Sequence, residues 1–385
     1  MTRIGEHFGT LDFGGIRAGT AIRTRGGDSC ITLAEPAHGL DYSPDNRTVA
    51  VVGKSNDLYI LDTANGLREA DSIATATLSA VSDLEFTPDG NHLLVVETSD
   101  DGGVAPQLLV FDTSDWSLET NYSLPTPYTG HIVSPKLAVS PDSSECFVVG
   151  GSSFDSDASD GTNYTFVIEP LTGNILQNLD GALNTGTDAE YTPNGDYVLM
   201  SEYNLGWAYD TSDWSTIRVS EMSTSANPLK YNSVAVAPDN ETFAFGGSHT
   251  TNNQEWTTSD FDDGSFIAIP TEMNRDWQVL QDNDEFRVAT YAGASPTPDV
   301  SNIEFSPKGN GRFAAGLSSG HLHFFDTDEV RNHGPMKSLI DQPTYYDETV
   351  LEAEMPFAYS PDGTKFVYSY GERICILRPD EYFES

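Results

Sequence analysis

A short turn of the form Ser/Thr/Ala-Pro-Asp, or a close variant of it, recurs seven times along the 385-residue chain. Proline presets φ at the second position of a type I turn, Asp or Asn suits the third position, and four copies have glycine at the fourth. The copies are Ser43-Pro44-Asp45, Thr87-Pro88-Asp89, Ser140-Pro141-Asp142, Thr192-Pro193-Asn194, Ala237-Pro238-Asp239, Ser306-Pro307-Lys308 and Ser360-Pro361-Asp362. Each copy predicts a tight corner between two antiparallel strands, and the repetition predicts a repeat protein.

The segments around each turn predict two further strands. A third strand ends in an apolar residue and an acid, at Leu61-Asp62-Thr63, Phe111-Asp112-Thr113, Tyr209-Asp210-Thr211 and Phe325-Asp326-Thr327. Two copies continue with the same six residues, Asp-Thr-Ser-Asp-Trp-Ser, at 112–117 and 210–215. We interpret this hexapeptide as a turn into a fourth, outer strand, and four strands per repeat are typical of a propeller blade.

From about residue 30 to the C-terminus the repeats resemble those of the WD40 and YVTN-type propeller superfamily. Successive turn prolines lie 44 to 69 residues apart, and a WD40 blade of ~40 to ~45 residues with loop insertions has this period. The expected fold is all-β, a seven-bladed β-propeller of four-stranded antiparallel blades. Because only 24 residues follow Pro361, we expect a strand near Cys30 to Glu35 to complete the last blade. The resemblance implies a fold and no activity.

The chain is strongly acidic, with 59 Asp and Glu against 19 Lys and Arg and a net charge of -40. Only six of the basic residues are Lys, and the acids are spread over every repeat, which resembles proteins of salt-in halophiles. Repulsion at this charge opposes a compact state, but at roughly 1 M salt the Debye length is about 3 Å and the repulsion is screened. We therefore expect a protein that needs molar salt and does not bind nucleic acid.

Residues 1–29 match no blade, and we assign them as a glycine-rich, relatively basic N-terminal arm ahead of a propeller domain at 30–385. The arm has seven glycines and three acids. Its four arginines give it a net charge of about +1, whereas the rest of the chain is very acidic; the arginines are Arg3, Arg17, Arg23 and Arg25. Such an arm can lie along its own propeller or cross to a neighbouring subunit. We hypothesise that it serves assembly.

The first strands of four repeats carry an acid at the equivalent position, Asp41, Glu85, Glu190 and Glu304. First strands line the axis of a propeller, and several carboxylates near one axis are the oxygen ligands that Ca²⁺ or Mg²⁺ prefers. The alternative is a hydrated centre without a specific ion, so the sequence predicts no required cofactor and leaves a calcium or magnesium ion at the axis as a hypothesis.

Two of the three cysteines, Cys30 and Cys375, fall on the strands expected to pair in the last blade. We expect two small buried side chains that stay reduced, as thiols do in the cytosol, and the alternative is a covalent clasp between the two strands.

These features favour a non-catalytic protein, because the sequence has no nucleophile elbow, no Gly-rich phosphate loop and no other set of residues that identifies a reaction. Our prediction is a structural, protein-binding component of a halophilic assembly, with a capsid or tail protein of an archaeal virus as its sharpest form. The alternatives are a cytoplasmic scaffold hub and a lactonase or hydrolase with a metal at the axis. No apolar stretch approaches the length of a membrane span and no signal peptide is evident, so we expect no membrane insertion.

Overall fold

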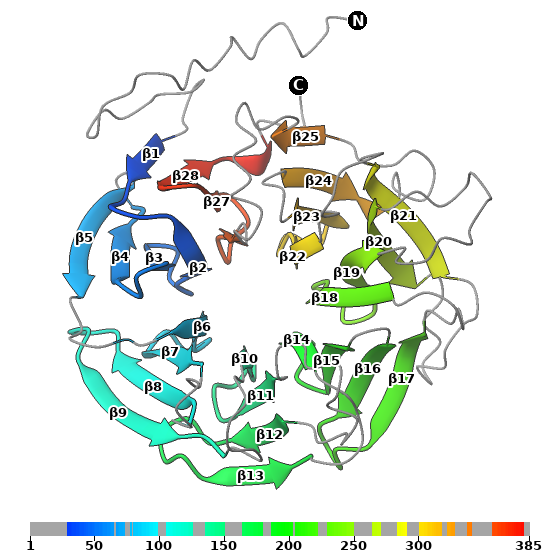
Figure 1. Cartoon of the computed structure of the whole chain (residues 1–385), viewed down its shortest axis with the longest axis horizontal. Coiled ribbons are helices and arrows are strands. Elements are labelled where there is room, and N and C mark those ends of the chain that lie inside the picture. The colour runs from blue at the N-terminus through cyan, green and yellow to red at the C-terminus, as the bar shows by residue number, and fades with distance from the viewer. Residues whose placement is uncertain are drawn as a thin grey trace, which may run out of the picture.

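A computed structural model of the chain describes residues 29–64, 67–73, 78, 80–98, 105–125, 135–150, 164–179, 186–202, 205–221, 229–249, 264–270, 283–290, 300–317, 322–327, 337–340 and 356–380. The strands of these residues form seven four-stranded antiparallel sheets. Figure 1 shows the sheets arranged around a common centre, each with one strand innermost. The prediction of an all-β chain is confirmed, and repeated sheets of this kind are consistent with a propeller-type fold.

We number the sheets 1 to 7 in chain order and give their strands from the centre outwards. Sheet 1 contains β2 (Ala37–Tyr42), β3 (Thr48–Gly53), β4 (Leu58–Asp62) and β5 (Arg68–Ile73). Sheet 2 contains β6 (Val81–Phe86), β7 (His92–Glu97), β8 (Gln107–Asp112) and β9 (Leu118–Ser123). Sheet 3 contains β10 (Lys136–Val139), β11 (Cys146–Gly150), β12 (Tyr164–Ile168) and β13 (Ile175–Asn178).

The later sheets follow the same order along the chain. Sheet 4 contains β14 (Gly186–Tyr191), β15 (Tyr197–Glu202), β16 (Leu205–Asp210) and β17 (Thr216–Glu221). Sheet 5 contains β18 (Leu229–Val236), β19 (Phe243–His249), β20 (Gly264–Pro270) and β21 (Asn283–Thr290). Sheet 6 contains β22 (Val300–Phe305), β23 (Arg312–Leu317), β24 (Leu322–Asp326) and β25 (Lys337–Ile340).

Sheet 7 combines the two ends of the described chain. It contains β26 (Phe357–Tyr359), β27 (Phe366–Tyr370), β28 (Arg373–Leu377) and, as its outer strand, β1 (Ser29–Thr32). The strand expected near Cys30 to Glu35 is therefore β1, and it begins one residue earlier, at Ser29. Residues 1–28 of the predicted arm, with its arginines Arg3, Arg17, Arg23 and Arg25, lie outside the described residues.

The Pro-containing corners have the predicted turn geometry. In the first corner the amide of Asn46 donates to the carbonyl of Ser43 (3.0 Å), and the equivalent bond closes each of the other six corners. The fourth residue has positive φ, which glycine adopts without strain, as at Gly90 (73°). Asn46 (62°) and Asn240 (61°) adopt the same conformation, and asparagine tolerates it better than most residues.

The core lies between neighbouring sheets. The second strands are apolar at consecutive positions because both faces are covered, so that Val49 to Val52 and Leu93 to Val96 have no exposed surface. One cluster joins Ala50 of sheet 1 to Leu84 of sheet 2. Other clusters join sheets 3 and 4, sheets 5 and 6, and sheets 7 and 1 in the same way. Clusters also join sheets 2 and 3 and sheets 6 and 7, so the apolar core is buried between sheets that are neighbours in the ring.

Candidate functional site

The four acids predicted at the axis lie where the innermost strands meet. Asp41 is on β2, Glu85 on β6, Glu190 on β14 and Glu304 on β22, and Figure 1 shows these strands at the centre of the ring. All four side chains are partly exposed. Leu84 and Phe86 of β6 pack in the cluster shared with sheet 1. The intervening Glu85 therefore lies on the opposite face of the strand, toward sheet 3.

Each of the four carboxylates accepts a hydrogen bond from the main chain of the next sheet. Asp41 Oδ2 accepts from the amide of Phe86 (2.6 Å), and Glu85 Oε2 accepts from the amide of Val139 (3.0 Å). The same bond joins Glu190 Oε2 to the amide of Val236 (3.0 Å) and Glu304 Oε1 to the amide of Tyr359 (3.0 Å).

In two sheets a second acid, two residues earlier, repeats the contact. Asp83 Oδ2 accepts from the amide of Leu137 (2.9 Å), and Asp188 Oδ2 accepts from the amide of Val234 (3.0 Å). Residues two apart in a strand point to the same side, so the Asp-x-Glu pairs at 83–85 and 188–190 act together. Our sequence analysis missed these aspartates, although their period-two spacing was a usable signal.

The physical reason for these bonds is that an innermost strand has a sheet partner on one side only. Alternate amides on its other side have no strand to donate to, and a buried amide without an acceptor is costly. The carboxylates of the preceding sheet supply that acceptor. They therefore connect sheets 1 to 2, 2 to 3, 4 to 5 and 6 to 7 at the centre.

One described cation lies within this group of acids. Lys136 Nζ is 3.9 Å from Asp83 Oδ1 and donates to the carbonyl oxygen of Ser82 (3.0 Å). Its charge also lowers the pKa of Asp188, against the larger effect of burial. Lys136 lies on β10, the innermost strand of sheet 3, which contains no acidic residue. The sequence analysis did not identify it.

Burial raises the pKa of the central carboxyl groups. The pKa is raised to about 7 for Asp41 and for Asp188, and to about 8 for Glu190, with the main-chain donors acting in the opposite direction. For Glu85 and Glu304 burial is again the largest cause, and repulsion from Asp41 and Glu190 adds to it. Although solvent touches these side chains, their oxygens lie between sheets, so part of the group is protonated near neutral pH.

The same geometry bears on the predicted cation. Among the residues that the structure describes, no group of three or more His, Cys, Asp or Glu is arranged to hold a metal ion. Each of the four carboxylates assigned to calcium or magnesium from the sequence accepts a main-chain hydrogen bond, and the axial ion stays a hypothesis. The described contacts of these carboxyl groups join neighbouring sheets.

Corner residues form a second set of contacts between sheets. The amide of Asp89 donates to Ser143 Oγ (3.0 Å), and the amide of Asn194 donates to Asn240 Oδ1 (2.7 Å). The amide of Asp362 donates to Asn46 Oδ1 (3.0 Å), which joins sheet 7 to sheet 1. These contacts link sheets 2 to 3, 4 to 5 and 7 to 1 away from the centre.

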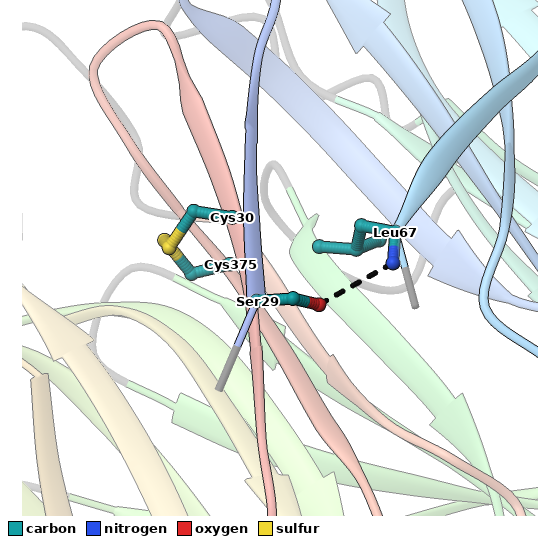
Figure 2. The surroundings of a disulfide bond; sticks show 4 residues. All are labelled: Ser29, Cys30, Leu67 and Cys375. Atoms are coloured by element: carbon teal, nitrogen blue, oxygen red, sulfur yellow. Dashed lines mark hydrogen bonds between the residues drawn. A yellow bond between two sulfur atoms is a disulfide. The ribbon is translucent and has the colours of Figure 1, made fainter. Parts of the chain in front are cut away.

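Cys30 and Cys375 face each other across β1 and β28 and form a disulfide, which joins residues 345 apart in the sequence. Figure 2 shows the bond and, beside it, the hydrogen bond from the amide of Leu67 to Ser29 Oγ (3.3 Å). The third cysteine, Cys146, is buried and free, and burial raises the pKa of its thiol well above the usual value.

The described part of the chain has no helix that is long and apolar enough to cross a membrane. The long connections that follow several second strands, including residues 151–163 and 250–263, lie outside the described residues.

Comparison with known proteins identifies a fold and no family. No protein-family model matches the sequence, and no curated protein matches it. Among solved structures, a chain of Kuenenia stuttgartiensis hydrazine synthase is similar with a TM-score of 0.63, at 16% sequence identity, over 94% of this chain and 99% of that chain. In all, 1585 chains of solved structures match. At this identity, and with so many matches, the likeness concerns the fold alone.

Proposed function

We propose that the seven sheets are the blades of a seven-bladed β-propeller of the WD40 and YVTN type, completed by β1, and that the protein is a non-catalytic interaction component of a larger assembly. The observation that carries this proposal is the use of the central carboxylates. The groups that an axial active site would employ accept amide hydrogen bonds that hold one sheet to the next. A ring stiffened in this way is suited to present its rims to partners.

The net charge supports a high-salt setting for this assembly. At -40 the protein is repelled by further copies of itself, and a Debye length of about 3 Å in roughly 1 M salt removes most of that repulsion. We therefore infer a halophilic protein that meets its partners at molar salt. The relatively basic residues 1–28 are the segment whose charge is complementary to the acidic body.

The disulfide favours a component exposed on a particle over a cytoplasmic hub. Disulfides persist on virion and cell surfaces and in other oxidising surroundings, whereas cytosolic thiols are kept reduced. The bond between Cys30 and Cys375 fits the first setting, so we propose a decoration or tail component of a virus of a halophilic archaeon as the sharpest form of the function.

Deletion of residues 2–28 tests the role of the arm in assembly. The full chain and the deletion variant, which keeps Cys30, are compared by light scattering and by sedimentation with their native particle in molar salt. Loss of association with retention of the folded body supports the proposal. Unchanged association would show that the arm has no role in assembly. If both the full chain and the deletion variant were folded, free monomers, the assembly function itself would be rejected.

A further inference from the structure

β1 is the outer strand of sheet 7, and its side chains are the least buried of the four strands. It has four residues, none of them fully buried, and Thr32 is exposed. By contrast, every residue of β26 is buried, as are four of the five residues of β28. A short terminal strand at a sheet edge, with few buried side chains, belongs to the part of a fold that opens most easily.

The contacts of β1 with the body are few. It pairs with β28 over four residues, Ser29 Oγ accepts from the amide of Leu67 (3.3 Å), and the amide of Leu33 donates to the carbonyl of Glu372 (2.8 Å). Ile31 and Leu33 pack on the cluster between sheets 7 and 1. The disulfide is the one covalent tie between β1 and β28.

The surface that β1 covers is an apolar strand edge. Ile374 and Ile376 of β28 are at most 7% exposed, and the register sets Ile31 opposite Ile374 and Cys30 opposite Cys375. If β1 left, the outer amides and carbonyls of β28 would have no partner, and such an edge recruits another strand. The strand known to fit it in sequence and register is β1 itself.

Residues 33–36 form the short hinge between β1 and β2, and hydrogen bonds hold the end of this hinge that is next to β2. The carboxylate of Glu35 accepts from the amide of Ser55, and the carbonyl of Pro36 accepts from the amide of Lys54 (3.0 Å). Movement of β1 is therefore confined to the residues before Glu35. A short hinge of this kind favours exchange of a strand between two copies over a free, long-range excursion.

We propose that the disulfide is a redox latch on an exchangeable strand: once it is reduced, β1 leaves β28, and β1 of a second copy of this chain takes its place. Two copies that exchange β1 reciprocally form a symmetric dimer with the same interface on both subunits. Reoxidation then locks the exchange, because Cys30 of one copy meets Cys375 of the other. This inference does not depend on the assembly function proposed above.

The opening step is a thiol–disulfide exchange with a dithiol. One thiolate of the reductant attacks a sulfur of the disulfide and gives a mixed disulfide, and its second thiol then displaces the protein sulfur. The products are two cysteine thiols and the cyclic disulfide of the reductant. In the locking step, glutathione disulfide accepts the two electrons of Cys30 and Cys375 and leaves as two molecules of glutathione.

Two single-cysteine variants test the exchange. Cys30→Ser keeps Cys375, and Cys375→Ser keeps Cys30, so neither chain alone can make the native bond. The variants are mixed at high concentration in molar salt and treated with glutathione disulfide, and the products are separated on non-reducing gels and mapped by mass spectrometry. We expect a dimer with a Cys30–Cys375 peptide, which in this mixture must join two chains. Its absence, or a dimer joined only through Cys30–Cys30, Cys375–Cys375 or Cys146, would overturn the proposal.

Hydrogen exchange on the wild-type protein provides a second test that does not depend on the folding of either variant. The amide of Leu33 donates to Glu372, and the alternation of an antiparallel pair places the amide of Ile31 in the same hydrogen-bonded set. Reduction with dithiothreitol in molar salt should speed exchange at these two amides, as local opening requires, and leave the amides of Val367 and Ser369 in β27 unchanged. Equal exchange at β1 in the oxidised and reduced protein would show that the disulfide does not retain the strand, and the latch would be rejected.

Discussion

Replacement of Glu190 by glutamine should stabilise the protein at alkaline pH and leave its stability at acidic pH almost unchanged. Glutamine keeps the size of the side chain and an oxygen that accepts from the amide of Val236, the bond that Glu190 makes at 3.0 Å. The variant differs only in that it cannot ionise. The effect therefore isolates the cost of a charge between sheets at the centre of the ring.

The magnitude follows from the pKa of Glu190, which burial raises from 4.5 to about 8. A carboxyl group whose pKa is higher in the folded state than in the unfolded state costs nothing below the unfolded value and destabilises progressively as the pH rises. At ~1.4 kcal/mol for each pH unit between the two values, the cost has an upper limit of about 5 kcal/mol, which it approaches as the pH reaches 8. Glu190→Gln should recover up to that amount at pH 8 and about zero near pH 4.5.

The assay is denaturant unfolding in molar salt at several pH values between 4.5 and 8.5, with Glu241→Gln as the control. Glu241 lies in a corner of sheet 5 and is exposed, so its replacement changes the net charge equally without changing the centre. A Glu190→Gln variant that loses stability at every pH, or whose pH dependence equals that of Glu241→Gln, would refute the reasoning. It would show that the carboxylate form is the one that the fold requires.

Three further predictions concern the ring closure, the corners and the salt requirement. Cys30→Ser should lower the free energy of unfolding, measured with denaturant, by up to about 6 kcal/mol, since the bond closes a loop across 345 residues. Reduction of the wild-type protein should have the same effect. An unchanged midpoint of denaturant unfolding would contradict this prediction. Asn240→Ala should lower the free energy of unfolding by ~1 to ~3 kcal/mol, because it removes the acceptor for the amide of Asn194 and leaves alanine at a φ of 61°. Asn240→Gly relieves the backbone strain and should cost less. Equal losses of stability in the two variants would argue against strain at this corner. The melting temperature should rise as sodium chloride is raised from about 0.1 M to about 1 M, since the Debye length falls from about 10 Å to about 3 Å; a flat profile would contradict screening of the net charge.

Local sequence chemistry predicted the parts of the fold that depend on a few neighbouring residues. The Pro-Asp corners are the clearest case, because proline, a short polar residue and a residue tolerant of positive φ together specify a turn, and all seven corners close with the expected hydrogen bond. The apolar runs after the corners are likewise the buried second strands, as at Leu93 to Val96 in β7.

The use of the central acids was not predictable in the same way. The period of the repeats placed Asp41 and Glu85 on innermost strands, but their partners are amides about 45 to 54 residues further along the chain, and that pairing depends on how adjacent sheets sit. The local sequence is the same for a carboxylate that lines the axis and for one that accepts a hydrogen bond from a main-chain amide of the next sheet, so it cannot distinguish the two. The two Asp-Thr-Ser-Asp-Trp-Ser turns contain a further feature that we did not predict, since Trp116 and Trp214 both have a φ of 60°, a conformation that bulky residues rarely adopt.

The central claim, that this propeller-type protein is an interaction component of an assembly, is tested most directly by density-gradient fractionation of the producing culture in molar salt. The chain is located by peptide mass spectrometry among particles, envelopes and free cytosol, and its amount is compared with that of the other particle proteins. The account predicts co-sedimentation with a particle at a fixed stoichiometry across the peak. Recovery of the chain as a free, soluble monomer in the cytosol would contradict it.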